Sequence, residues 1–443
     1  MTSRIFLHSP SEAPDAARIV EQIPEFERYG ERALLLARPG DVVCLAHSID
    51  ERYLSFLRTL EIGPRDEDVL VISSVEPGAG LSARLIDDPQ SLDWIARRLS
   101  GSTRSFVCPF FATPDAFAVG RALHKRLSRP VRVLGGPAGL VRKLHEKVAA
   151  RALAESLGIP VAPGEVVQVV PADGSPPDLS VLRRAIERWS DATGHVIVRG
   201  SSGASGSSTF TSRSGDIDAM IDGVGERRDN AVYLVEPLFE ASSSPNVEIV
   251  VEPGVSLPDQ VGVTDQVLDP DLVYKGSTHP SRALRVPQMI EDSRAIVAWM
   301  RRRGFTGRVG FDYVEHEGKG GRAEHFLAEI NPRINGASYP LALTRHLAAL
   351  ASRFAAPAPR AFLTANVRVR ARDFGELERL SRSLLYDPAR GEGIVPHTVG
   401  ALSFGKVGIT CLGGSREAVE ALRERFVQLA GARPARTTSG AAS

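Results

Sequence analysis

Apolar and polar positions divide the first 137 residues into alternating strand-like and helix-like segments. Short apolar runs such as "VVCLAH" and "SFVCPFF" predict buried strands, whereas "SLDWIARRLS" and "PDAFAVGRALHKRL" carry apolar residues at helical spacing. Strands that alternate with helices predict a parallel α/β layer. We therefore expect a first domain over residues 1–137, which ends near the glycine-rich "LGGPAG".

After this region the pattern changes to helices interleaved with strands that polar loops connect. The segment "LVRKLHEKVAARALAESLG" predicts a helix, and "HVIVRG" and "STFTS" predict two strands around the loop "SSGASGSS". Farther on, "AVYLVEPLF" and "NVEIVVEPG" predict paired strands, and "DSRAIVAWMRRRGF" predicts an amphipathic helix. Two more strands surround "GKGG", which predicts a hairpin there.

The last part of the chain is set apart by the linker-like "AAPAPR" after residue 355. Strand-like "TANVRVRARD" and "KVGITCLGG" and helix-like "EAVEALRERFVQL" follow, which predicts a separate α/β domain over residues 356–433. Residues 434–443 contain almost no apolar anchor, so we expect them to be disordered.

Composition narrows the class of protein. At roughly 100–200 residues per domain, 443 residues allow two to four domains. The net charge of +1 gives no reason to expect nucleic acid or an anionic membrane as a partner. No window approaches the roughly 18 apolar residues of a membrane-spanning helix, and the first apolar run is too short for a signal peptide. Cys44, Cys108 and Cys411 lack metal or redox spacing, so we expect buried, reduced thiols in a cytoplasmic protein.

The two strands around "GKGG" carry the strongest chemical pattern. "GRVGFDYVEH" places Asp312 on the face opposite Phe311, and in "HFLAEINPRING" every second residue from Glu329 is polar. If the hairpin is symmetric about Gly320 and Gly321, Asp312 and Glu329 lie opposite each other.

Two like charges across a strand pair are destabilising unless a cation neutralises them. Mg²⁺ accepts carboxylate and amide oxygens, so Asp312, Glu329 and Asn331 are candidate metal ligands. Arg333 would then face a transferred phosphoryl group or an oxyanion. The alternative is the polar, solvent-facing side of an ordinary hairpin.

The glycine-rich loop after "VIVRG" is a second candidate site. Glycines at 200, 203 and 206 permit close backbone approach, and successive amides can hold a phosphate. No GK[ST] follows and the next segment is strand-like, which excludes a Walker loop and a dinucleotide-binding turn. One interpretation is a flap over phosphates with Arg199 as a fixed cation beside it; the other is a flexible surface turn.

Together these segments resemble the ATP-grasp superfamily over residues 138–355. The resemblance implies a first lobe at 138–236 with the glycine-rich flap and a second lobe at 237–355 with the metal site. The N-terminal layer would be a pre-ATP-grasp domain. The expected fold class is α/β, with α+β grasp lobes and a small C-terminal α/β domain.

The resemblance also assigns residues to ATP. Lys147 matches a lysine that contacts the nucleotide phosphates, and Arg199 stands where the family usually has a second lysine. Glu236 and Leu238 would line the adenine edge, with Glu236 also near the ribose, and Glu248 matches an acidic residue near the ribose and triphosphate. The flap residues implied to bind ATP are Ser202, Gly203, Ala204, Ser205 and Gly206.

The metal hairpin matches the family as well. Asp312, Glu329 and Asn331 match its ligands for one or two Mg²⁺ ions, with Mn²⁺ as an alternative. Arg333 matches an arginine that several members place near the transferred phosphate. The resemblance implies that the γ-phosphoryl group passes to a carboxylate and that an amine then attacks the acyl phosphate.

The tail stretch "GIVPHTVGALSFGKVGIT" looks like that of the ATP-grasp peptide ligases of actinobacterial peptide-antibiotic biosynthesis, of the pheganomycin ligase type. The implied enzyme joins a small carboxylic acid to the amine of an amino acid or peptide. Two alternatives stay open: a phosphotransferase or carboxylase-type enzyme with a non-amine acceptor, and a non-catalytic ATP-binding module. The family often forms dimers, so a homodimer is also open.

The stretch "YKGSTHPSRAL" lies between the expected hinge and the metal hairpin. Its polar side chains are candidates for holding a substrate carboxylate, and the alternative is a solvated basic loop. The candidate residues are Lys275, His279, Arg282 and the following Arg285, with Ser338 and Tyr339 after the metal strand.

Overall fold

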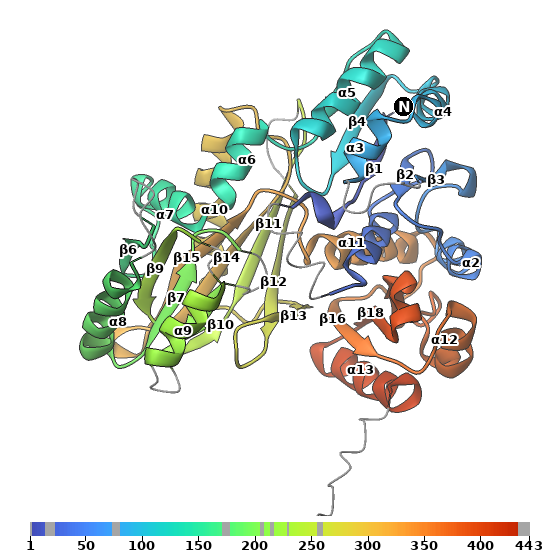
Figure 1. Ribbon diagram of the computed structural model, residues 1–443. Helices are drawn as coiled ribbons and strands as arrows, with labels where there is room; N and C mark the ends of the chain where they lie inside the picture. The colour runs from blue at the N-terminus through green and yellow to red at the C-terminus, as the bar shows by residue number, and fades with distance from the viewer. Residues whose placement is uncertain are drawn as a thin grey trace, which may run out of the picture.

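The computed structural model describes residues 2–432 except 14–22, 73–79, 171–177, 204–207, 213–216, 228–229 and 255–259. Sheets of five, four and nine strands organise the described chain. In Figure 1 the N-terminal layer and the C-terminal segment lie on one side of the molecule. The four-stranded sheet lies on the other side, and the strands of the nine-stranded sheet run between them.

The N-terminal layer is the parallel α/β layer that the sequence predicted. Its strands follow the order β3-β2-β1-β4-β5, and each neighbouring pair is parallel. The strands are β1 (Thr2–Leu7), β2 (Val42–Leu45), β3 (Val69–Val71), β4 (Arg104–Pro109) and β5 (Val131–Val133). One face packs apolar side chains against α3 (Leu81–Ile86), α4 (Pro89–Leu99) and α5 (Pro114–Leu127). The other face joins a core that continues into the rest of the molecule.

The first lobe is a small antiparallel sheet in the order β6-β9-β7-β8. Its strands are β6 (Glu165–Gln168), β7 (Val196–Gly200), β8 (Thr209–Thr211) and β9 (Val232–Pro237). Helices α8 (Leu179–Thr193) and α9 (Ile217–Arg227) pack on it around a hydrophobic cluster of its own. Helices α6 (Ala138–His145) and α7 (Lys147–Ser156) lead into this lobe from the N-terminal layer.

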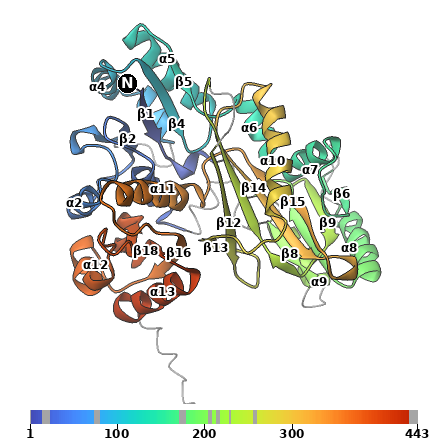
Figure 2. The same cartoon turned by 180° about the vertical axis from the view of Figure 1, so that it is seen from behind.

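The nine-stranded sheet is antiparallel throughout and carries the second lobe. The strands of this lobe are β10 (Ala241–Ser243), β11 (Pro245–Val251), β12 (Gln260–Leu268), β13 (Tyr274–His279), β14 (Gly307–Glu317) and β15 (Ala323–Asn331). Helix α10 (Val286–Arg301) crosses one face of this sheet (Figure 2). There the Tyr313 hydroxyl donates to the Met289 carbonyl at 3.1 Å. The opposite face is therefore the one left for a ligand.

The tail segment, expected as a separate domain, adds its strands to the same sheet. Strands β16 (Ala361–Arg368), β17 (Gly393–His397) and β18 (Lys406–Gly413) continue the sheet, because β13 pairs with β16. Gly276 permits the close approach, since a Cβ there would lie 2.0 Å from the Thr364 carbonyl oxygen. Helix α11 (Ser338–Arg353) ends the second lobe, and the helices of the tail are α12 (Phe374–Ser381) and α13 (Arg416–Ala430).

The tail also packs against the N-terminal layer. Helix α2 (Glu51–Thr59) begins at Asp50, whose side chain accepts the backbone N–H groups of Arg52 and Tyr53. The ring of Tyr53 lies 5.4 Å from that of Phe374, and its hydroxyl donates to the Pro396 carbonyl at 2.9 Å. The two ends of the chain therefore share one core with the second lobe.

Two expectations from composition can be compared with this structure. Cys44, Cys108 and Cys411 are unpaired and buried, as predicted. Within the described residues, no helix has the length and apolar character needed to cross a membrane.

Candidate functional site

One face of strands β11, β14 and β15 collects the polar residues of the second lobe. The predicted register is confirmed: Asp312 pairs with Glu329, and Asn246 pairs with Asp312 from the other side. Since paired residues in a sheet point to the same face, these three side chains lie on one surface. The face opposite carries Phe311 and Tyr313, which are fully buried.

A β-bulge interrupts the hairpin immediately beyond the carboxylate pair. Asp312 pairs with Glu329 but Tyr313 pairs with Leu327, so Ala328 is the extra residue. The Ala328 carbonyl instead accepts a hydrogen bond from Nη1 of Arg199 at 3.0 Å. The bulge thus links the metal hairpin to the first lobe.

Amide groups surround the Asp312 carboxylate. Nδ2 of Asn246 donates to one oxygen at 2.6 Å, and Nδ2 of Asn331 donates to the other at 2.8 Å. Burial, and next the charge of Glu329, raise the pKa of Asp312 to about 7, although Arg333 and hydrogen bonds lower it. A cation bound on this face would oppose both effects, because its charge stabilises the ionised carboxylates.

The donor set fits a hard divalent cation. The described residues contain no group of three or more His, Cys, Asp or Glu side chains suited to a metal, so thiolate or imidazole sites find no support there. The face instead offers two carboxylates and the amides of Asn246 and Asn331, which present oxygens after a half-turn of each amide. Oδ1 of Asn246 is buried and accepts no hydrogen bond. Because Nδ2 of Asn246 donates to Asp312, this oxygen is directed away from that carboxylate, and the same half-turn would bring it to a cation beside Asp312.

Lys147 joins the glycine-rich segment to the metal hairpin. Its Nζ lies 3.6 Å from Oε2 of Glu329 and donates to the Gly203 carbonyl at 2.9 Å. Helix α7 begins at this lysine, whose side chain is buried. In the same segment the Ser202 backbone N–H donates to Oδ1 of Asn230 at 2.6 Å. The predicted flap residues Ala204, Ser205 and Gly206 lie outside the described residues.

Arg199 is paired within the protein rather than presented as an isolated cation. Its Nε donates to Oε2 of Glu236 at 2.9 Å, and Nη1 of Arg151 donates to Oε1 of the same carboxylate at 2.9 Å. Glu236 is 3% exposed, so this is a buried cluster of one carboxylate and two guanidinium groups. Leu238 follows β9 at half-buried depth, and its backbone N–H donates to the His195 carbonyl at 2.8 Å.

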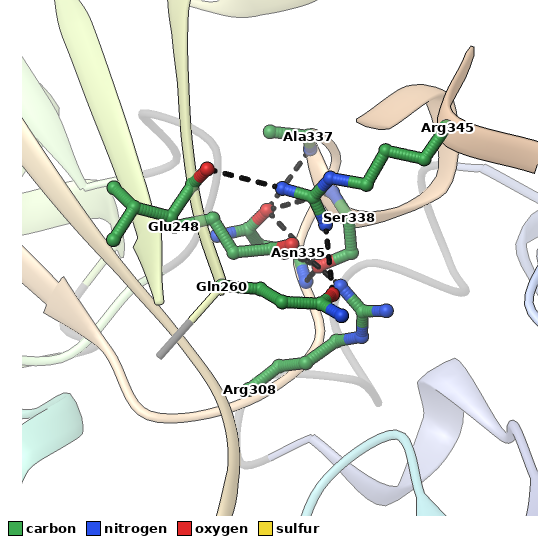
Figure 3. Close-up of polar contacts among 8 residues, drawn as sticks. Glu248, Gln260, Arg308, Asn335, Ala337, Ser338 and Arg345 are labelled. Carbon is green, nitrogen blue, oxygen red and sulfur yellow. Dashed lines mark hydrogen bonds and ion pairs between the residues drawn. The ribbon is translucent and has the colours of Figure 1, made fainter. Parts of the chain in front are cut away.

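A second polar cluster, drawn in Figure 3, surrounds Glu248. It lies on the same sheet face as Asp312, because Glu248 pairs with Gly310, two residues before Asp312 on β14. The fully buried Glu248 accepts from Nη1 of Arg308 and from Oγ of Ser338. Asn335 completes the turn after β15, where its Oδ1 accepts from the Ala337 backbone at 2.9 Å. Glu248 and Ser338, which the sequence assigned to ATP and to substrate respectively, thus contact each other.

The candidate residues of the basic loop are held away from this face. Lys275 pairs with Asp269 at 2.8 Å, and Nδ1 of His279 lies 2.8 Å from the Val263 carbonyl. The backbone N–H of Arg285 donates to Glu315 at 2.7 Å. Glu315 is an odd number of residues from Asp312 on β14, so it points to the α10 side of the sheet.

The backbone N–H of Arg282 similarly donates to Oδ2 of Asp265 at 2.8 Å. The structure therefore does not bring Lys275, His279, Arg282 or Arg285 to the carboxylate pair.

Sequence reasoning missed three residues of the polar face, although a signal was present. Arg308 and Gly310 precede Asp312 at alternate positions of "GRVGFDY", and Asn246 precedes Glu248 in the same way. The alternation that placed Asp312 opposite Phe311 also places them on its face. Gly310 has a packing reason, since a Cβ there would lie 1.9 Å from Nδ2 of Asn335.

Comparisons with known proteins agree with this architecture. A family model described as "Pre ATP-grasp domain" matches residues 30–124, and one described as "PGM1 C-terminal domain" matches residues 373–426. No curated protein sequence matches the chain.

Solved structures align with nearly the whole chain. An ADP complex of N5-carboxyaminoimidazole ribonucleotide synthetase has 14% identity and a TM-score of 0.56, over 96% of this chain and 95% of that one. The biotin carboxylase–β,γ-ATP complex from Campylobacter jejuni has 11% identity and a TM-score of 0.55, over 97% and 91%.

A third solved structure is the biotin carboxylase domain dimer of Hydrogenobacter thermophilus 2-oxoglutarate carboxylase, in complex with MgADP, ADP and bicarbonate. It has 10% identity and a TM-score of 0.51, over 97% of this chain and 90% of that one. At such identities the likeness concerns the fold. The chain therefore has an α/β ATP-grasp fold, with an N-terminal segment that matches the pre-ATP-grasp domain model, antiparallel grasp sheets and a C-terminal domain.

Proposed function

We propose that the chain is an ATP-dependent, ADP-forming ligase of peptide natural-product biosynthesis. It would phosphorylate the carboxylate of an amino acid or related acid and join it to the amine of an amino acid or peptide. The observation that carries this proposal is the pairing of Asp312 with Glu329 on a face lined by amides. The peptide-ligase part rests on the tail motif, which lies within the segment that matches the PGM1 C-terminal domain.

The polar face of β11, β14 and β15 that carries Asp312 and Glu329, called the metal face below, would bind the nucleotide's cation. Asp312, Glu329 and Asn331 are the proposed ligands of one or two Mg²⁺ ions, with Asn246 beside them. Mg²⁺ there would neutralise the phosphate oxygens and the developing charge during phosphoryl transfer. The protein would then hold the carboxylate and amide oxygens of these ligands in one fixed geometry.

Two cations would act at the transferred group. Lys147 lies between Gly203 and Glu329, which suits a lysine that contacts phosphates held under the flap. Arg333 follows the metal strand and lowers the pKa of Asp312, so its charge acts on the same site. We assign Arg333 to the acyl phosphate and the tetrahedral oxyanion.

The proposed reaction needs no nucleophilic side chain of the protein, because both nucleophiles belong to the substrates. The substrate carboxylate oxygen attacks the γ-phosphorus and ADP leaves, after which the amine attacks the acyl carbon and inorganic phosphate leaves. The amine nitrogen loses a proton as the amide forms. The nucleotide would lie between the flap residues Ser202–Gly206 and β9, with Glu236 and Leu238 at its adenine edge and Glu248 toward the ribose and triphosphate.

An assay of ADP and phosphate release tests this proposal. Panels of acids and amines are supplied with MgATP, and the products are identified by mass spectrometry. Turnover that needs both an acid and an amine is the expected result. Glu329→Gln should lower it by roughly 10²-fold or more, because a metal ligand is lost. The control is Glu324→Gln, which alters an exposed carboxylate on the same strand. Unchanged turnover in Glu329→Gln would contradict the metal assignment.

A carboxylase-type reaction is the second candidate. The observation that favours it is the similarity of fold to a biotin carboxylase domain whose structure includes bicarbonate. In this case bicarbonate would be the activated acid. ADP release that depends on bicarbonate, with no organic acid present, would select this alternative.

A further inference from the structure

A cavity of about 180 Å³ lies between the N-terminal layer and the second lobe. Phe6 and Phe110 of the layer and Ile334 of the second lobe supply part of its apolar wall. Arg333 also lines it, so the cavity begins beside the metal face. Drug-sized ligands occupy pockets of roughly 300–1,000 Å³, and the smaller cavity suits a group the size of one amino acid.

Guanidinium groups dominate the polar part of the lining, which includes Arg4, Arg38, Arg308 and Arg333. One buried carboxylate, Asp41, ties the backbones of Arg4 and Arg38 together. The backbone N–H groups of Arg4 and Arg38 donate to separate oxygens of Asp41 at 2.8 and 3.0 Å. Because Asp41 is 3% exposed and fully used by these bonds, it fixes the backbone of both arginines.

Near Arg4 and Arg38, the lining of the cavity has more positive than negative charge. Arg308 is neutralised by the buried Glu248. Arg4 has Glu252 at 3.6 Å, but that side chain is 40% exposed, and ion pairs this exposed to solvent are weak. Among the described lining residues Glu252 is the only carboxylate, and Arg38 is exposed at the cavity mouth. An anionic ligand could therefore replace Glu252 beside Arg4 and contact the guanidinium groups of both Arg4 and Arg38.

We propose that Arg4 and Arg38 bind a substrate carboxylate other than the one that is phosphorylated. The inference rests on the proposed function, in which the metal face and Arg333 define where the activated carboxylate lies. A guanidinium fork matches a carboxylate with two parallel hydrogen bonds, and the apolar wall accommodates a hydrocarbon side chain.

The carboxylate is assigned to the amine substrate. That substrate is then an amino acid or a short peptide with a free carboxylate, and a simple amine does not replace it. The second carboxylate of a dicarboxylic acid has the same chemistry, so the experiment needs arms that separate the two sources.

Binding is measured first without ATP, by thermal shift and calorimetry on the full chain. The ligands are the proteinogenic α-amino acids and their carboxamides, 3-methylbutylamine and glutarate, at millimolar concentration. We expect stabilisation by one or more apolar amino acids and none by the matched amides or the simple amine. Stabilisation by glutarate but by no amino acid would support the carboxylate site and assign it to the acid. Absence of any carboxylate-dependent stabilisation would overturn the proposal.

Single substitutions then test whether the identified ligand binds at Arg4 and Arg38. Arg38→Gln and Arg4→Gln should each weaken the identified ligand by roughly 10-fold or more, because a charge-assisted hydrogen bond is lost. Glu252→Gln should tighten it severalfold, because the competing carboxylate is removed. Arg97→Gln, an exposed arginine of α4 that does not line the cavity, should leave it unchanged. Equal binding by Arg38→Gln, Arg4→Gln and the wild type would overturn the assignment.

ADP release by the same proteins separates the two proposals. Amino-acid binding that Arg38→Gln weakens, in a protein without ATP turnover, would contradict the proposed function and leave the cavity assignment standing. Full turnover with carboxylate-free amines would contradict the cavity assignment and leave the ligase function standing.

Discussion

At the scale of single residues, the alternation of side chains explains most of what the sequence predicted at the site. It placed Asp312, Glu329 and Asn331 on one face, and the hairpin register agrees. It could not reveal the partners of Arg199, because Glu236 reaches that guanidinium through the pairing of β7 with β9, and Ala328 reaches it through the packing of the two lobes. Side-chain direction follows from local geometry, whereas a partner depends on tertiary structure.

Asp312→Asn is expected to stabilise the metal-free protein by about 1 kcal/mol, because it removes one of two like charges paired across the strands. The same change should abolish stabilisation by Mg²⁺, since a ligand is lost. Thermal unfolding with EDTA and with Mg²⁺ measures both effects. An Asp312→Asn protein that Mg²⁺ stabilises as strongly as the wild type would exclude this face as the cation site.

Arg199 links the two lobes, and a substitution can separate this contact from its proposed role at the phosphates. It donates to Glu236 and to the Ala328 carbonyl, which lysine could not do with one ammonium group in the same geometry. Arg199→Lys should therefore lower the free energy of unfolding by about 1–3 kcal/mol. The control is Arg188→Lys in the exposed pair with Glu165, where a change below about 0.5 kcal/mol is expected.

Chemical denaturation measures both variants, and the KM for ATP is determined in parallel. A raised KM in Arg199→Lys with unchanged stability would show that the guanidinium serves the phosphates and not the link between lobes.

At the scale of elements, sequence periodicity predicted the strands and helices better than their pairing. The symmetric hairpin count gave the correct partner for Asp312, yet it could not reveal the bulge at Ala328, which shifts every pair from Tyr313 to the turn by one residue. A bulge is selected by contacts outside the hairpin, here the Arg199 bond. Likewise, "AAPAPR" indicated a domain boundary, although β16 continues the sheet from β13.

The β13–β16 junction makes a prediction at this scale. Gly276→Ala should destabilise the protein by about 1–3 kcal/mol, since the added Cβ would meet the Thr364 carbonyl. Gly139→Ala in α6 is the matched change with open space around the Cβ, and it should stabilise by roughly 0.5–1 kcal/mol. Urea denaturation compares the two. Equal effects of the two substitutions on the free energy of unfolding would mean that β13 and β16 can move apart at Gly276 without loss of stability.

At the scale of the whole molecule, the proposed site lies between elements that pack on two different hydrophobic cores. The large core joins the N-terminal layer, the second lobe and the tail, whereas β6–β9 with α8 and α9 enclose a separate cluster. The links between them include the Arg199 bond to Ala328 and the Lys147 bond to the Gly203 carbonyl. The strands of the proposed metal ligands therefore pack on the large core, whereas β7, which carries Arg199, packs on the small one.

This division predicts two cooperative units in hydrogen exchange. Amides of β6–β9 should exchange through a lower-energy opening than those of β11 and β14, because the smaller cluster buries less apolar surface. MgATP should slow exchange in the first lobe more than in the large core, since a ligand held by both lobes stabilises the weaker one most. Exchange mass spectrometry with and without a non-hydrolysable nucleotide measures this difference. If both units were protected equally before and after nucleotide addition, the first lobe would not be a separately opening element, and closure over the nucleotide would need another origin.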